Sequence, residues 1–146
     1  MKKKLAVLGT VLVLIVTMVV TLCGCSSYGK IESAFKDDGW EIVSDVDALQ
    51  NDLKDQIESV AGENYKDICD VHVFKKSVLG IPTYCSILEF KSDKDLTAKF
   101  EESYKALGMT DEQIKTAVEK IQELPNVNGN CVFVGVVGLD VFKGTK

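Results

Sequence analysis

The spacing of apolar positions divides most of this chain into helical and strand-like segments. Apolar residues recur every three or four positions, as on one face of a helix, over residues 28–38, 44–61, 92–107 and 110–124. Runs rich in branched and aromatic residues, which are typical of strands, cover residues 40–43, 68–78, 83–91 and 131–137. The last run is almost continuously apolar, which predicts burial on both faces of a sheet. Residues 138–144 fit either a short helix or the end of a strand.

Two of the predicted helices begin with recognisable capping signals. Ser92 precedes an acidic first turn, which is favourable at the positive end of a helix dipole. Thr110 is followed three residues later by Gln113, which is the capping-box pattern. Both helix starts are therefore predicted at these residues.

The order of the elements is that of an α+β protein. Residues 79–82 predict a loop of four or five residues that joins segments 68–78 and 83–91 into a β-hairpin. If the first helix is set aside and the last two are merged, the order becomes βαββαβ, which is the ferredoxin-like pattern. We therefore expect an antiparallel four-stranded sheet with helices on one face and an extra N-terminal helix.

A segment of different composition precedes these elements. Residues 2–4 are lysines, and an uncharged apolar run follows over residues 5–22, which is about 27 Å long if helical. The run ends in Leu22-Cys23-Gly24-Cys25. This arrangement resembles the signal peptide and lipobox of bacterial membrane lipoproteins. Because the run is nearly long enough to span a membrane, a transmembrane anchor is the alternative, although no basic cluster follows Cys25.

The resemblance implies a modification site and a location. Gly24 takes the position before the cleavage point, and Cys25 takes the position that receives a thioether-linked diacylglycerol. Cleavage before Cys23 would place Leu22 where the family has a small residue, so Cys25 is the better assignment. Two acyl chains give stable attachment to the extracytoplasmic face of the cell membrane. The expected divisions are a cleaved signal peptide (1–24), a lipidated tether (25–29) and a single α+β domain (30–146).

The net charge of the mature domain limits the classes of partner that it can bind. Cleavage after Gly24 leaves 122 of the 146 residues and lowers the formal net charge from −5 to −8, because three lysines are removed. An acidic domain without arginine is repelled by nucleic acid and by anionic membrane surfaces, so we expect no nucleic-acid partner. Its contact with the membrane is the lipid anchor, and the sequence does not identify a further protein or small-molecule partner.

Three further cysteines lie in strand-like apolar runs. They are Cys69, Cys85 and Cys131. An odd number leaves at least one thiol without a partner inside the chain. Because free cysteines in apolar runs commonly pack as small hydrophobic residues, we expect three buried free thiols. One disulfide is the alternative, since an extracytoplasmic location permits it.

Catalytic and metal chemistry has little support in the sequence. His72 is the only histidine, which excludes a metal site with several histidines in one chain. A hairpin turn centred on residues 80 and 81 places His72 opposite Glu89, which predicts an ion pair, with a proton-transfer pair as the alternative. The acidic pairs do not follow a calcium loop, and there is no phosphate loop or nucleophile elbow. We expect no catalytic, cofactor-binding or metal residues.

The function that best fits these observations is a non-enzymatic interaction module on a membrane lipoprotein. A domain that binds a small molecule or peptide on a sheet face or edge is the alternative, and an enzyme fits less well. An apolar groove lined by Trp40 or Tyr84 would favour ligand binding. A single exposed apolar patch would favour a protein partner.

Substitution of Cys25 tests the lipoprotein assignment directly. We expect Cys25→Ala to abolish labelling with radioactive fatty acid and to leave an uncleaved precursor or a released domain. Cys23→Ala is the matched control and should still be labelled. Continued lipid labelling of Cys25→Ala would contradict the assignment.

Overall fold

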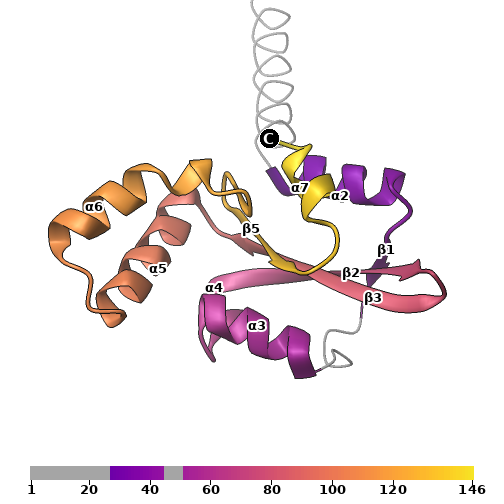
Figure 1. Ribbon diagram of the computed structural model, residues 1–146, viewed down its shortest axis with the longest axis horizontal. Coiled ribbons are helices and arrows are strands. Elements are labelled where there is room, and N and C mark those ends of the chain that lie inside the picture. Colours follow the sequence, from indigo (N-terminus) through magenta and orange to yellow (C-terminus); the bar gives the residue numbers. More distant parts are fainter. Residues whose placement is uncertain (1–26, 45–50) are drawn as a thin grey trace, which may run out of the picture.

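The fold is seen in a computed structural model that describes residues 27–44 and 51–146 (Figure 1). The lipobox with Cys25 and the first part of the helix expected over residues 44–61 lie outside the described residues. Helix α2 (Ser27–Asp37) begins one residue earlier than expected, so residues 27–29 of the expected tether are helical. Among the described residues, no helix has the length and apolar character needed to cross a membrane.

The centre of the fold is an open antiparallel sheet of five strands in the order β1-β2-β3-β5-β4. Their bounds are β1 (Glu41–Val43), β2 (Cys69–Val78), β3 (Ile81–Phe90), β4 (Val127–Asn128) and β5 (Cys131–Gly135). The α+β class with an antiparallel sheet is confirmed, but the expected number of four strands is wrong. The additional strand, β4, has two residues in a turn-rich stretch, too few to show an alternating pattern.

The strand order also differs from the ferredoxin-like pattern. That pattern contains a split βαβ unit, in which a further strand lies between two parallel strands that a helix joins. Here β1 and β2 are direct antiparallel neighbours, paired from Glu41↔Lys75 to Val43↔Val73. The chain between them therefore returns beside β1 and does not cross over another strand.

Helices follow the sequence pattern closely where caps are present. Ser92 caps α5 (Asp93–Ala106), and its Oγ accepts a hydrogen bond from the Asp95 amide at 3.2 Å. Thr110 and Gln113 form the predicted capping box of α6 (Asp111–Glu119). The remaining helical elements are α3 (Asn51–Ala61), α4 (Tyr65–Ile68), the 3₁₀ turn η2 (Ile121–Glu123) and α7 (Leu139–Lys143). The ambiguous residues 138–144 thus contain a helix, and α4 was not expected. The helix expected over residues 110–124 ends at Glu119, and the 3₁₀ turn η2 follows it.

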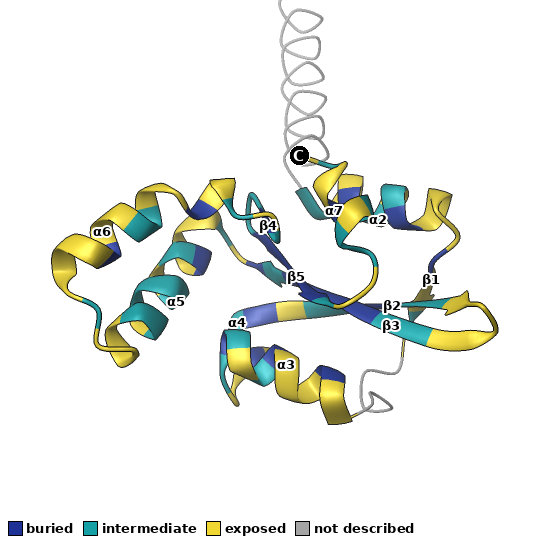
Figure 2. Ribbon diagram, viewed as in Figure 1, coloured by how far each residue is buried: buried dark blue, intermediate teal, exposed yellow. Residues whose placement is uncertain are grey.

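Helices cover both faces of the sheet, and the expectation of a single covered face is wrong. Side chains along a strand point alternately to opposite faces, so Val73 and Leu88 face α3, whereas Phe74 and Ile87 face α2 and α7. Figure 2 shows buried positions on both sides of the strands. All four residues from Cys131 to Val134 are buried, which confirms the predicted burial for this part of segment 131–137, whereas Val136 and Val137 are exposed after the strand has ended.

The β2–β3 hairpin turns more tightly than expected. Val78 pairs with Ile81, which leaves a two-residue turn at Leu79-Gly80 in place of a loop of four or five residues. Both turn residues have positive φ (52° and 80°), as in a type I′ turn, whose twist matches that of the strands. Pro82 lies within β3, beyond the end of its pairing with β5, where a missing N–H removes no described ladder bond.

Ser86 offers a test of the packing between the sheet and α3. Its side chain is fully buried, and among the described residues its Oγ has no hydrogen-bond partner. Ser86→Ala should therefore leave the free energy of unfolding unchanged or raise it by up to about 1 kcal/mol, because no bond is lost. Chemical denaturation measures the change. Leu88→Ala is the matched core control and should cost about 2–5 kcal/mol. A comparable loss in Ser86→Ala would contradict this account.

Candidate interaction site

The turn of the β2–β3 hairpin carries the most exposed apolar side chain among the described residues. We call residues 78–82 (Val78-Leu79-Gly80-Ile81-Pro82) the hairpin tip. Leu79 is 97% exposed, Ile81 66% and Val78 36%. Figure 1 places the tip at one end of the sheet and α5 with α6 at the other, and Figure 2 shows the tip as exposed. Five consecutive residues without a polar side chain thus meet solvent together.

The backbone conformation of Leu79 is also unusual for an exposed leucine. Its φ of +52° lies in the left-handed region, which costs an ordinary residue about 1–2 kcal/mol. Asparagine or aspartate before glycine is the preferred pair for this turn, because both tolerate positive φ and like to meet water. An exposed leucine satisfies neither preference. Positions that break a local rule in this way are commonly functional.

We call residues 73–77 and 83–86 the stem of the hairpin, and its charged residues are Lys75 and Lys76, of which Lys76 is paired with a carboxylate. The Lys76 Nζ lies 2.9 Å from the Asp38 Oδ2, and this hydrogen bond lowers the pKa of the Asp38 carboxyl. The Lys75 Nζ lies 5.9 Å from the centre of the Tyr84 ring. No acidic residue occurs between positions 71 and 88. The tip therefore stands on a braced stem with basic flanks, in a domain that is otherwise acidic.

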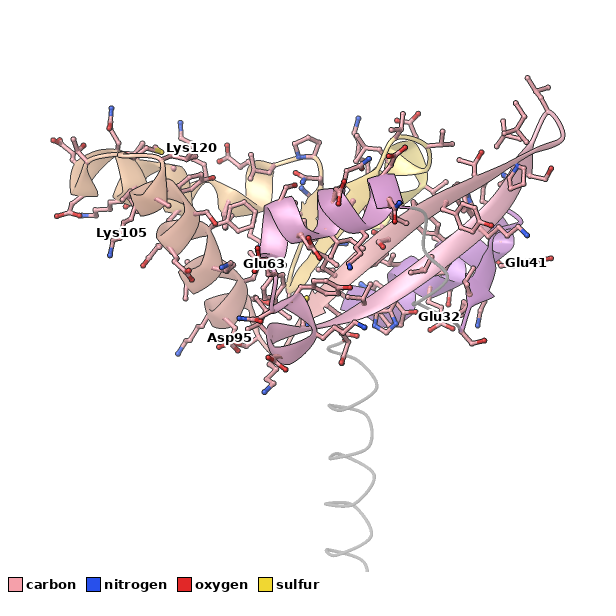
Figure 3. All side chains as sticks on the ribbon, turned by 90° about the horizontal axis from the view of Figure 1, so that it is seen from below. Glu32, Glu41, Glu63, Asp95, Lys105 and Lys120 are labelled. Carbon is pink, nitrogen blue, oxygen red and sulfur yellow. The ribbon has the colours of Figure 1, made fainter. Side chains whose placement is uncertain are left out.

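A cleft lies at the opposite end of the same two strands. Its volume is about 260 Å³, and we call it the α4–α5 cleft after the helices on its two sides. Its lining residues are Asp67, Ile68, Phe90, Lys91, Asp95, Ala98, Lys99 and Glu102. Figure 3 shows Asp95 beside α4 at the start of α5. The lining combines apolar and charged side chains, which makes the cleft suitable for a small apolar group with polar neighbours.

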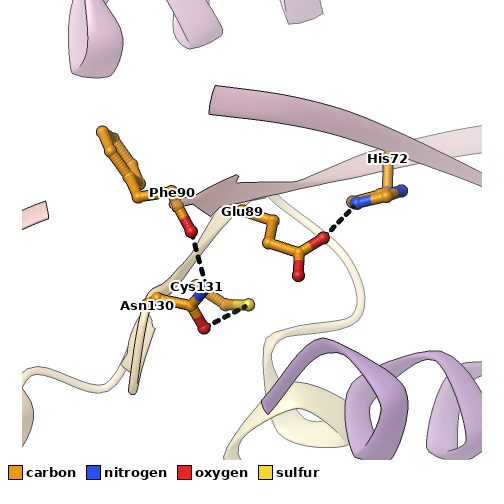
Figure 4. Close-up of polar contacts among 5 residues, drawn as sticks. All are labelled: His72, Glu89, Phe90, Asn130 and Cys131. Atoms are coloured by element: carbon orange, nitrogen blue, oxygen red, sulfur yellow. Dashed lines mark hydrogen bonds and ion pairs between the residues drawn. The ribbon is translucent and has the colours of Figure 1, made fainter. Parts of the chain in front are cut away.

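The predicted pair of His72 and Glu89 is present, although the predicted register is not. The His72 Nε2 lies 2.8 Å from the Glu89 Oε2 (Figure 4). His72 is opposite Ile87, and Glu89 is opposite Asp70, so the ion pair is diagonal and the register differs from the expected one by two positions. A shift of two positions keeps both side chains on the same face, which is why the pair survives.

Tyr28 completes a cluster with this pair. Its ring stacks on the His72 imidazole, with 3.6 Å between the ring centres and 18° between the planes. Burial, together with the nearby carboxylates of Glu32 and Glu89, raises the pKa of the Tyr28 phenol. The cluster joins α2 to β2 and β3. The stacking and the ion pair thus hold α2 against the sheet, and His72 does not line the α4–α5 cleft.

The two aromatic residues expected to mark a ligand groove have other positions. Trp40 is buried between α2 and the sheet, and its indole Nε1 donates to the Asp38 Oδ2 at 3.2 Å. Tyr84 packs at the margin of the opposite core. Neither residue lines the α4–α5 cleft. In the part of the chain that the structure describes, no group of three or more acidic, histidine or cysteine side chains is placed to hold a metal ion.

The three cysteines are buried and free, which confirms the expectation for them. Cys69 lies in the core under α3, whereas Cys85 and Cys131 lie in the core under α2. Cys85 is opposite Gly135 and Cys131 is opposite Glu89, so these two are four positions apart along the strands, or roughly 13 Å. That separation is too large for a disulfide.

Comparison of the chain with protein-family models, with curated proteins and with solved structures finds no match.

The sequence contained only some of the signals for the hairpin tip and for the α4–α5 cleft. Residues 79–82 were predicted to form a loop and Val78 to end a strand, but the full exposure of this stretch depends on where the neighbouring strand β5 ends. The α4–α5 cleft depends on α4, a single turn of helix that no sequence pattern indicated.

Alkylation of the native protein tests the state of the cysteines. Burial raises the pKa of Cys69 to about 11 and those of Cys85 and Cys131 to about 12, so all three thiols are neutral at pH 8. Since the thiolate is the nucleophile, we expect little reaction of Cys69, Cys85 and Cys131 with iodoacetamide before unfolding and modification of all three in guanidinium. Intact mass should not change on reduction. Fast native alkylation, or a gain of two hydrogens on reduction, would contradict the described arrangement.

Proposed function

We propose that this chain is a membrane-anchored lipoprotein whose extracytoplasmic domain binds a protein through the hairpin tip. The anchor is Cys25, on the basis of its lipobox. The domain is a non-enzymatic interaction module in this proposal. The buried neutral thiols and the packing role of His72 support the absence of a reaction centre among these groups.

The observation that carries the proposal is the exposure of the Leu79 side chain. This side chain is almost fully exposed on a backbone conformation that a leucine adopts at a cost. A partner that buries Leu79 and Ile81 would gain about 1.5–3 kcal/mol for each side chain. That gain gives a physical reason for an apolar side chain at a position where asparagine would stabilise the free domain.

The placement of the tip agrees with the proposed anchor. Two peptide units separate Cys25 from Ser27, the first residue of α2, which limits the distance between them to about 7 Å. Helices α2 and α7 lie over one face of the sheet (Figure 1). Anchored in this way, the domain holds the face under α2 and α7 toward the membrane. The hairpin tip then lies at the side of the domain.

The hairpin tip favours insertion of side chains over addition of a strand. Residues 81–84 of β3 extend past the described pairing with β5, so the outer edge of β3 is open there. Pro82 lies in this stretch and cannot donate a backbone hydrogen bond. Proline at an open edge is one of the ways in which proteins prevent pairing with another strand.

The α4–α5 cleft supports a second candidate function, which is binding of a small molecule or a short peptide. Its volume of about 260 Å³ is at the lower limit for ligand pockets, and it offers three carboxylates and two ammonium groups beside apolar side chains. A thermal-shift screen of small zwitterionic compounds tests this candidate. Binding that is lost in Ala98→Arg would favour it over the hairpin tip.

Substitution of Leu79 separates the role of the tip in binding a partner from its effect on the stability of the domain. Leu79→Asn should raise the free energy of unfolding by about 1 kcal/mol, because asparagine tolerates the left-handed conformation. The same variant should lose most of the partner recovered by in-cell cross-linking and mass spectrometry. Leu107→Asn removes another exposed leucine, 78% exposed at the end of α5, and should leave recovery unchanged. Equal recovery from wild type and Leu79→Asn would overturn the proposed function.

A further inference from the structure

The hairpin tip and the α4–α5 cleft lie at opposite ends of one pair of strands. The turn at Leu79-Gly80 joins β2 to β3 at the tip. At the other end, Ile68 precedes β2 and Phe90 ends β3, and both residues line the cleft. Ten residues of β2 separate the two features, or roughly 33 Å. A shift of the molecule along its own strands therefore brings the tip of one copy to the cleft of the next.

We propose that the partner of the hairpin tip is the α4–α5 cleft of a second copy of this chain. This inference rests on the proposed function and names the occupant of the tip. The apolar residues that line the cleft are Ile68, Phe90 and Ala98, and they match the apolar side chains of Leu79 and Ile81. The cleft volume of about 260 Å³ is smaller than a typical ligand pocket, and it suits one or two inserted side chains.

Charge around the two features is complementary. The rim of the cleft carries Asp67, Asp95 and Glu102 together with Lys91 and Lys99. The Lys99 Nζ lies 3.3 Å from the Glu102 Oε1, so these two charges largely offset each other. Two carboxylates and one ammonium group remain on the rim. The stem of the tip brings Lys75 to this rim, while the charge of Lys76 is largely offset by its pairing with Asp38, and one positive charge beside a net negative rim favours this orientation over tip-to-tip contact.

The proposed anchor is compatible with this geometry. Copies related by a shift along the strands keep the same orientation, so every copy presents α2 on the same side. All copies in such a row can therefore be anchored in one membrane. A contact between two different surfaces does not close on two copies, and it generates an open chain.

Photo-cross-linking of the lipidated full-length protein in its own membrane tests the contact. A photoreactive amino acid at position 81 leaves Leu79 in place. We expect an adduct of two copies, with the cross-link mapped to peptides that contain Ile68, Phe90 or Ala98. The adduct should fall at least tenfold in Leu79→Asn and should be unchanged in Leu107→Asn.

Mixing two variants identifies the head-to-tail arrangement. Leu79→Asn removes the tip, and Ala98→Arg fills the cleft from an exposed position of α5 where arginine is compatible with a helix. Neither variant alone should form adducts. Co-expressed with different tags, they should form one adduct species only, between the intact tip of the Ala98→Arg copy and the intact cleft of the Leu79→Asn copy. Circular dichroism of each variant establishes that it is folded.

The outcomes separate the two proposals. An adduct with a different protein that depends on Leu79 would overturn self-association and leave the proposed function standing. An adduct of two copies that maps to the tip of both would also overturn the head-to-tail contact. The absence of any adduct that depends on Leu79 would overturn both proposals.

Discussion

The ten-residue antiparallel pairing of β2 and β3 is the constraint on which the rest of the domain depends. Its register decides which of its side chains face α3 and which face α2, and it therefore assigns the buried residues of both strands to one of two core clusters. It also places β5 against only part of β3, from Cys85 to Glu89. The remaining length of the hairpin extends past the sheet, with Leu79 at its end. A slip by one position would turn the side chains of one of these strands to the opposite face.

Sequence reasoning succeeded where a signal was local. The caps at Ser92 and Thr110 were identified because a side chain and an amide three residues away decide them. The His72–Glu89 pair was identified even with a register wrong by two, because only the face had to be correct. The buried segment beginning at Cys131 was identified from its continuous apolar character.

The features that the sequence did not predict have a different cause, because they depend on contacts between distant parts of the chain. Strand β4 exists because Val127 and Asn128 pair with β5, and neither residue carries a strand signal alone. The tight turn was missed because Leu79-Gly80 does not resemble a type I′ pair. Coverage of both faces requires α2 and α7, which come from the two ends of the described chain, to meet over Phe133. No local pattern contains that information.

The stacked rings of Tyr28 and His72 have a mechanical consequence. Tyr28 lies in the first turn of α2, three residues after Cys25, and His72 lies in β2 and pairs with Glu89 of β3. With Cys25 as the proposed anchor, a pull from the membrane enters the domain at α2. It then passes sideways through these rings and the ion pair into the two longest strands. These contacts tie the first turn of α2 to the sheet, so a pull at Cys25 would load the two strands together with the helix.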